Sequence, residues 1–405
     1  MSCLTFSRQT LAVFSGNDAM SATIYLDHNA TTQPTPEVVA AMVDTLRHCW
    51  GNASSAHSMG GAAKSRLVKA RAQVAALLGA SPAEIVFTSG ATESNHMAIL
   101  GALTAQPGKT HIVSSTVEHP ATLTLLEHLD ALGFAITYLE VDGQGRLDPA
   151  RIEAALTPQT AVLSLMWANN ETGVLFPIAE AARIAKARGV WFHTDAVQAV
   201  GKLEVDARQI PFDLLSISAH KLHGPPGVGA LFVRKGMVLP PLMFGHQERR
   251  RRGGTENLPG IVGFGEAAQQ LGQSWRADVA HMQTLRDTFE QQLMQRFPDV
   301  RINASAAERL PNTSNFAFGH IDSEIILDQL DKAGVCASSG SACTAGGTEP
   351  SHVLSAMGQP PEAALAALRF SFGSGNSAAE IQQVLDLLQG IAEPLLHEAT
   401  MTSAA

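Results

Sequence analysis

The chain has 405 residues, 45% of them apolar, and a formal net charge of −9. This length exceeds what one hydrophobic core usually serves, so we expect two domains. The negative charge argues against a general nucleic-acid-binding protein, whose footprint is a basic face, and favours an enzyme that acts on a small molecule.

The four cysteines are scattered and form no CxxC pair; they are Cys3, Cys49, Cys336 and Cys343. Their spacing favours neither a disulfide framework nor a structural zinc site, and it indicates a reducing, cytoplasmic setting. No apolar stretch is long enough to span a bilayer, so we expect no membrane association.

The first residues resemble no export signal, because they lack an apolar core followed by a cleavage site. Ordered-looking sequence begins near Met20. We therefore expect residues 1–19 to be a disordered extension.

Short apolar or β-branched runs then alternate with longer helical patterns. We predict strands over residues 84–88, 111–115, 135–141, 161–166, 190–193, 214–218 and 229–233. We predict helices between them over residues 93–103, 121–132, 149–156 and 178–188. This alternation predicts an α/β fold with a mostly parallel sheet, whose ligands lie beyond the carboxyl ends of the strands.

The pattern changes after Pro259. A long helical stretch to about Phe297 precedes a strand, helix, strand and helix series that ends at Leu396. We therefore predict a large domain over residues 34–258, and a smaller α+β domain made of residues 20–33 and 259–400.

Lys221 directly follows an apolar strand, at the sheet edge where such folds build their sites. Most lysines are merely solvated, but partial burial among Ser, His, Gly and Pro residues favours an amine that forms an imine or carries protons. Asp195 ends another apolar strand, and by itself it is explained equally well as a helix N-cap. Together the two residues match pyridoxal phosphate, which needs a lysine imine and a carboxylate facing its pyridinium nitrogen.

A phosphate cradle is predicted over residues 88–95, where a strand leads through Gly90 to hydroxyl residues and a helix start. A structural capping turn has the same pattern, so both interpretations stay open. The arginine run over residues 249–252 is either a solvated face or, with the Gly253-Gly254-Thr255 that follows it, an anion site.

Cys343 lies in a run of small and hydroxyl residues, 338–344, with no apolar periodicity to bury it. It is a candidate nucleophile, and the alternative is an incidental thiol. Gly340 before it and Gly346-Gly347 after it favour a mobile loop.

Several motifs in this order resemble the group I cysteine desulfurases, which are class V aminotransferases of pyridoxal-phosphate fold type I. The matching runs are YLDHNATT at 25–32, NNETG at 169–173, HTDAVQ at 193–198, HK at 220–221 and SSGSAC at 338–343. Residues 166–173, 245–249 and 349–353 further resemble the NifS type, which serves nitrogenase assembly. The resemblance runs from about Ile24 to the last helix and implies a large, mostly parallel-sheet domain with a smaller α+β domain.

The resemblance also implies a role for each site residue. Lys221 binds pyridoxal 5'-phosphate as an imine, Asp195 faces the pyridinium nitrogen and Gln198 bonds the ring oxygen. His119 stacks on the ring and exchanges protons. The phosphate site would consist of Ala91, Thr92, Ser218, His220 and, from the second subunit of a homodimer, Thr255. The substrate carboxylate would be held by Asn170 and Arg369, since a planar guanidinium matches carboxylate geometry.

In this family L-cysteine is converted to L-alanine while its sulfur forms a persulfide, here on Cys343. The resemblance implies that a NifU-like or IscU-like iron–sulfur scaffold accepts the sulfur. It also implies Cys343 as a transient iron–sulfur ligand shared with that scaffold.

The sequence also admits three other interpretations. His220 and His223 lie three residues apart and His246 lies near the arginine run, but no third ligand at a spacing suitable for zinc accompanies them. A related lyase, such as a selenocysteine lyase, or an aminotransferase shares the cofactor, although a plain aminotransferase does not need Cys343. A non-catalytic sulfur carrier that kept the fold would not need Lys221, Asp195 and Gln198 together.

Overall fold

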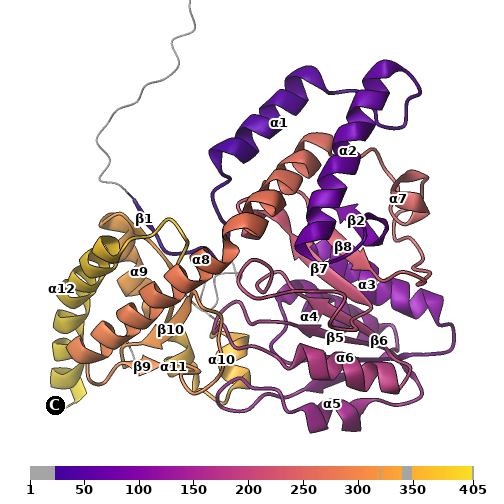
Figure 1. The fold of residues 1–405 in the computed structure, drawn as a ribbon. Coiled ribbons are helices and arrows are strands. Elements are labelled where there is room, and N and C mark those ends of the chain that lie inside the picture. The colour runs from indigo at the N-terminus through magenta and orange to yellow at the C-terminus, as the bar shows by residue number, and fades with distance from the viewer. Residues whose placement is uncertain (1–22, 320, 340–348, 404–405) are drawn as a thin grey trace, which may run out of the picture.

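A seven-stranded sheet lies at the centre of the larger part of the molecule (Figure 1). The computed structural model describes residues 23–319, 321–339 and 349–403. The strand order in the sheet is β2-β8-β7-β6-β5-β3-β4. The strands are β2 (Ile85–Thr88), β3 (His111–Ser115), β4 (Ala135–Leu139), β5 (Thr160–Met166), β6 (Trp191–Asp195), β7 (Leu214–Ser218) and β8 (Gly229–Val233). Neighbouring strands from β4 to β7 pair in parallel, whereas β8 is antiparallel to both β7 and β2. The predicted mostly parallel sheet is confirmed.

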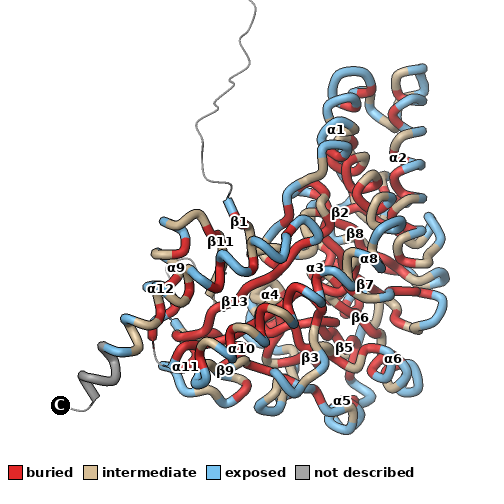
Figure 2. Tube along the Cα trace, turned by 60° about the vertical axis from the view of Figure 1, so that its left-hand side comes forward, coloured by how far each residue is buried: buried red, intermediate tan, exposed pale blue. Residues whose placement is uncertain are grey.

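Helices cover both faces of this sheet because alternate side chains of each strand point to opposite faces. Val86 packs with Met97 of α3 on one face, and Phe87 packs in the cluster that contains Leu67 of α2 on the other. The first face carries α3 (Ala91–Ala105) and α4 (Pro120–Ala131), and the second carries α2 (Ser58–Leu77), α5 (Pro149–Ala155) and α6 (Ile178–Ala187). Figure 2 shows the strands buried between the helices and the outer helix faces exposed.

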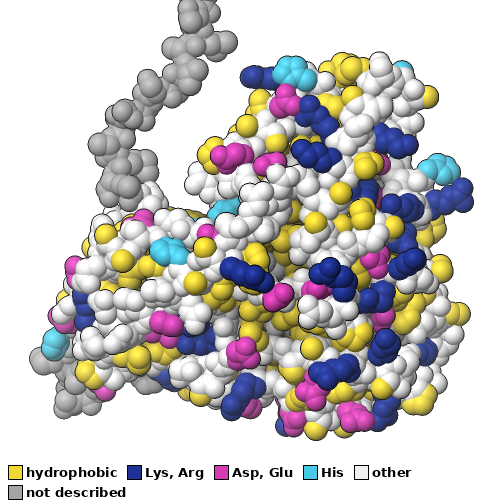
Figure 3. All heavy atoms as spheres, viewed as in Figure 1, with side chains coloured by type: hydrophobic (Ala, Val, Ile, Leu, Met, Phe, Trp, Pro, Cys, Tyr) yellow, Lys and Arg dark blue, Asp and Glu magenta, His cyan; other side chains and the backbone are white. Residues whose placement is uncertain are grey.

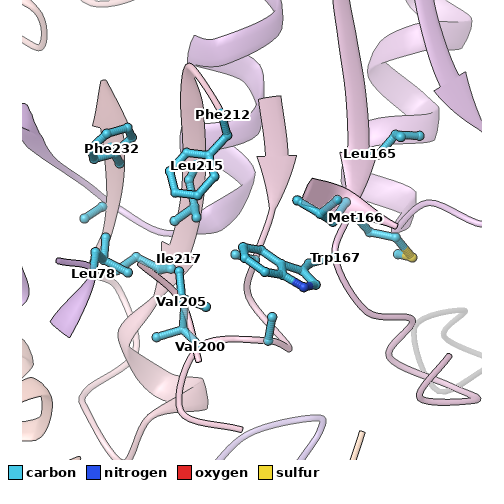
Figure 4. Packing of buried hydrophobic residues seen from close by; sticks show 14 of the residues in the cluster. Leu78, Leu165, Met166, Trp167, Val200, Val205, Phe212, Leu215, Ile217 and Phe232 are labelled. Carbon is cyan, nitrogen blue, oxygen red and sulfur yellow. The ribbon is translucent and has the colours of Figure 1, made fainter. Parts of the chain in front are cut away.

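Large aromatic residues fill the core behind the carboxyl end of β5. Trp167 meets the ring of Phe212 at 6.3 Å between centroids, and Phe212 meets Phe232 at 5.3 Å, both edge to face (Figure 4). The backbone N–H of Trp167 also donates to the carbonyl of Asp195 (2.8 Å). This packing gives the residues that follow β5 and β6 a rigid base.

Two further helices, α1 (Pro36–His48) and α2, pack against the first half of the long helix α8 (Leu258–Arg296). Neither α1 nor α2 is among the predicted elements. The local signals for α1 are present, because Thr35 caps it by accepting from the N–H of Val38 (3.2 Å) and Pro36 occupies its first turn.

The smaller part of the molecule contains a four-stranded antiparallel sheet of order β12-β13-β10-β9 and a parallel pair, β1 with β11. The strands are β1 (Ile24–Tyr25), β9 (Arg301–Ile302), β10 (Thr313–Ala317), β11 (Val335–Cys336), β12 (Ser338–Ser339) and β13 (Ala367–Ser371). The helices are α9 (Ser323–Lys332), α10 (His352–Ala356), α11 (Pro361–Leu365) and α12 (Ala378–Ser403). The predicted strand-helix-strand-helix series corresponds to β10, α9, β13 and α12. It omits the shorter elements, and its end at Leu396 is wrong, because α12 continues to Ser403.

A cluster of phenylalanines forms the core of this smaller part. Phe289 of α8 lies 5.2 to 5.6 Å, between ring centroids, from Phe316, Phe370 and Phe372. The first half of α8 instead contributes Phe264 to the core of the larger part. The domain division at residues 34 and 258 stays a prediction, since one continuous helix enters both cores.

Acidic and basic side chains are interspersed on the face shown in Figure 3. Within the described residues, no helix is both long and apolar enough to cross a membrane. The predicted extension over residues 1–19 lies outside the described residues, as does Cys343.

Candidate active site

The site lies at the carboxyl ends of β5, β6 and β7, where a cavity of about 410 Å³ opens. Ten of the residues that the sequence analysis singles out line this one cavity: Ala91, Thr92, His119, Asn170, Asp195, Gln198, Ser218, His220, Lys221 and Arg369. They come from both parts of the chain, since Arg369 belongs to β13. This cavity lies where ligands are expected to bind, beyond the strand ends.

Lys221 ends a short 3-10 turn, η2 (Ala219–Lys221), directly after the fully buried strand β7. Its Nζ donates to the backbone carbonyls of Asn29 (2.5 Å) and Ala30 (2.6 Å). These carbonyls hold the amine at the wall of the cavity. They lie about 190 positions away in the sequence, which is why no sequence pattern indicated them.

Asp195 ends β6, which pairs in parallel with β7, so its carboxylate lies at the same sheet edge as Lys221. Its Oδ2 accepts from Asn95 Nδ2 (2.7 Å) and its Oδ1 accepts from the N–H of Val197 (3.0 Å). Asn95 belongs to α3, and the sequence analysis gave it no role of this kind. Held from two sides, the carboxylate keeps a fixed orientation in the cavity.

The turn between β2 and α3 matches the predicted phosphate cradle. Gly90 occupies the N-cap of α3 without a side-chain hydrogen bond to the first turn, so the helix start is not capped from within. A Cβ on Gly229 would lie 2.8 Å from Gly90 Cα, and only glycine allows β8 to approach the turn this closely. Ala91 and Thr92 begin the helix and face the same cavity as Ser218.

Thr255 lines a neighbouring cavity of about 120 Å³ rather than the main one. Ser89 and Gly227 line both cavities, so the two adjoin. The arginine run beside Thr255 is not simply solvated, because Arg252 pairs with Glu93 of α3 (Nε to Oε1, 2.8 Å).

His119 is the N-cap of α4, and its Nδ1 accepts from the N–H of Ala121 (3.1 Å). Burial lowers the pKa of His119; the nearby Lys221 and His352 lower it further, while Asp195 opposes them. The imidazole is therefore neutral near pH 7 and carries its proton on Nε2.

Arg369 is almost fully buried, at 2% exposure. Its Nη2 donates to Asp27 Oδ1 (2.7 Å) and its Nη1 reaches the carbonyl of Asn170 (3.4 Å). Its Nε has no hydrogen-bond partner among the described residues. A buried donor without an acceptor is costly, so this geometry favours an anionic ligand at Arg369.

Sequence comparison assigns the chain to a known family. Residues 24–384 match the aminotransferase class-V family. The chain therefore belongs to the class-V aminotransferase family, and its predicted fold type is confirmed.

Individual relatives refine this assignment. A cysteine desulfurase of Trichormus azollae is 49% identical over 380 residues, which cover 92% of this chain and 93% of the relative. The cysteine desulfurase NifS of Azotobacter vinelandii is 47% identical over 366 residues, covering 90% and 91%. A solved structure described as a NifS-like protein superposes with a TM-score of 0.85 at 36% identity, covering 91% of this chain and 99% of that one. SspA in complex with cysteine gives a TM-score of 0.78 at 33% identity, covering 88% and 100%. Within the family, the protein is a pyridoxal-phosphate-dependent cysteine desulfurase, as the motifs predicted.

Proposed function

We propose that this enzyme takes the sulfur of L-cysteine onto Cys343, releases L-alanine and passes the sulfur to an iron–sulfur scaffold of the NifU-like or IscU-like kind. The observation that carries the proposal is that Lys221, Asp195 and Arg369 line one cavity. The 47% identity to a NifS protein supports a role in nitrogenase cluster assembly.

The residues present fit pyridoxal phosphate. The cavity volume of about 410 Å³ suits a ligand of this size. We assign Lys221 to its aldehyde carbon, Asp195 to its ring nitrogen and Gln198 to its ring oxygen. We assign the start of α3 with Ser218 and His220 to its phosphate, because free backbone N–H groups at a helix start bind anions. When bound, the cofactor serves as the electron sink for bonds broken at the substrate carbons.

The protein supplies binding and proton transfer. Arg369, held in place by Asp27, offers N–H donors of its guanidinium to the substrate carboxylate, with Asn170 beside it. The amine of Lys221 moves the proton at the substrate Cα. His119 is neutral and carries its proton on Nε2, so it can give that proton above the ring on which we expect it to stack.

Cys343 takes the sulfur. Its thiolate forms an S–S bond with the substrate sulfur as the substrate C–S bond breaks, and the electron pair of that bond stays with the carbon skeleton. Protonation of the skeleton then gives L-alanine. The loop expected around Cys343 would carry the persulfide to the scaffold, where Cys343 also serves as a transient iron–sulfur ligand.

We further propose a cytoplasmic homodimer in which Thr255 of the partner subunit completes the phosphate site. The position of Thr255 supports this, because it lines a cavity that adjoins the start of α3 rather than the main cavity of its own chain. In such a homodimer, Thr255 of the partner subunit would enter this adjoining cavity of the first subunit.

The test is an assay of the purified, cofactor-loaded enzyme for L-alanine and sulfide from L-cysteine, with and without a purified scaffold, in an excess of a thiol reductant that reduces the persulfide to sulfide and restores the Cys343 thiol. We expect equal amounts of both products, and faster sulfur release with the scaffold. A strong preference for L-selenocysteine in a parallel assay would instead identify a selenocysteine lyase. Lys221→Ala should lose the cofactor linkage that borohydride reduces; a linkage that survives in this variant refutes the role of Lys221.

A further inference from the structure

Lys202 is a buried lysine that the proposed chemistry does not use. Its exposure is 7%, and its Nζ donates to Gln198 Oε1 (3.0 Å) and to the Gln198 carbonyl (3.4 Å). On the other side of the same amide, Gln198 Nε2 donates to the carbonyl of Asn29 (2.9 Å). The side chain of Gln198 thus lies between the Lys202 amine, which donates to its oxygen, and the Asn29 carbonyl, which can only accept from its nitrogen.

The local backbone brings Lys202 to this position. After β6 the chain makes successive turns, in which Val200 and Leu203 donate backbone N–H groups to the carbonyls four residues before them. Gly201 adopts a φ of +84°, and a Cβ there would lie 2.8 Å from Leu271 and 3.0 Å from Leu222. Only glycine therefore allows the turn that places Lys202 beneath Gln198.

The surroundings of Lys202 are mainly cationic or neutral. It lines a small cavity of about 50 Å³ that also borders Lys221. Burial, together with the charges of Lys221 and Arg369, lowers the pKa of Lys202 to about 7. The other titratable groups that line this cavity are His28, His223 and Asp278. Among the described residues, Lys202 forms no salt bridge, so a stability role through ion pairing does not explain its burial.

We propose that Lys202 is a positioning residue: by holding Gln198 Oε1, it turns the Nε2 amide of Gln198 toward the ring oxygen of the bound cofactor. The inference rests on the proposed function, which assigns Gln198 to that oxygen. Nε2 carries two hydrogens, of which the Asn29 carbonyl uses one, and the second is left for the cofactor. Without Lys202, Oε1 faces no donor, and the amide loses the contact that keeps its oxygen away from the ring oxygen.

This role has a spectroscopic consequence. A hydrogen-bond donor at the ring oxygen stabilises the negative charge of that oxygen. The effect is largest when the nitrogen that Lys221 shares with the cofactor is unprotonated, because that nitrogen then carries no positive charge to compensate the oxygen. The donor therefore lowers the pH at which that nitrogen loses its proton. Loss of the donor raises the midpoint of the absorbance titration of the bound cofactor.

The experiment uses Lys202→Met, which keeps the side-chain length but removes the donor, in the cofactor-loaded enzyme. We expect the titration midpoint to rise by about one pH unit, the size that loss of one hydrogen bond to a charged acceptor produces. Lys69→Met, at an exposed position on α2, is the matched control and should leave the midpoint unchanged.

A double-mutant cycle separates positioning from a direct effect of charge. If Lys202 acts through Gln198, Lys202→Met should add little to the shift already caused by Gln198→Met. The inference would be overturned if the two midpoint shifts were additive, or if the absorbance titration of Lys202→Met had the same midpoint as that of the wild type. Since the wild-type enzyme is titrated and assayed with L-cysteine in parallel, failure of the proposed function appears separately, as a wild type without bound cofactor or without L-alanine.

Discussion

Arg369 should bind the substrate carboxylate through its planar guanidinium. Arg369→Lys keeps the positive charge near Asp27 but loses the planar fork. In the wild type, Asp27 accepts from Nη2 and the Asn170 carbonyl from Nη1, and the remaining N–H donors of the fork are the ones we assign to the substrate. A lysine cannot satisfy Asp27 and a carboxylate with the same geometry.

The loss should equal one charge-assisted hydrogen bond, about 1.5–3 kcal/mol. Since each 1.4 kcal/mol is a factor of ten, kcat/KM for L-cysteine should fall roughly 10- to 150-fold, mainly through KM. Steady-state L-alanine formation measures this. The matched control is Arg309→Lys, at an arginine whose side chain is 8% exposed and which forms two bonds with Glu290 (2.8 and 2.9 Å) outside the cavity. A kcat/KM of Arg369→Lys within twofold of the control would refute the assignment.

Three further predictions concern sulfur transfer, stability and pH. Cys343→Ser should keep the cofactor spectrum but form no L-alanine; normal turnover would remove Cys343 from the mechanism. Glu248→Gln leaves Arg71 buried without its charge partner (2.6 Å), so the free energy of unfolding in urea should fall by about 3 kcal/mol, against under about 1 kcal/mol for Glu153→Gln in an exposed pair. Equal losses would contradict this. Burial raises the pKa of Glu118 from 4.5 to about 8, so the folded protein retains a proton that the unfolded chain has lost. Stability should therefore fall as pH rises from 4.5 to 8, and Glu118→Gln should flatten this slope in urea titrations; identical slopes would count against it.

The sequence predicted much of the larger part of the fold because its signals are local. Each strand from β2 to β8 is a short apolar run, and turn residues separate the strands from the helices. The antiparallel direction of β8 had no such signal, because strand direction depends on which neighbours pair. The sequence likewise had no local signal for the short elements around β13 or for the end of α12.

Lys221 and Asp195 were placed from the sequence because each follows an apolar strand, and parallel strands bring their carboxyl ends to one edge. The family motifs then supplied the remaining residues and their expected roles. The Asn29 carbonyl that holds both Lys221 and Gln198, the Asp27 that holds Arg369, and the Lys202 beneath Gln198 gained their roles only in the tertiary structure. Most of these contacts join residues far apart in the chain, and even the Lys202–Gln198 contact depends on a turn packed against other elements. Packing of distant segments decides them, and no local pattern encodes that packing.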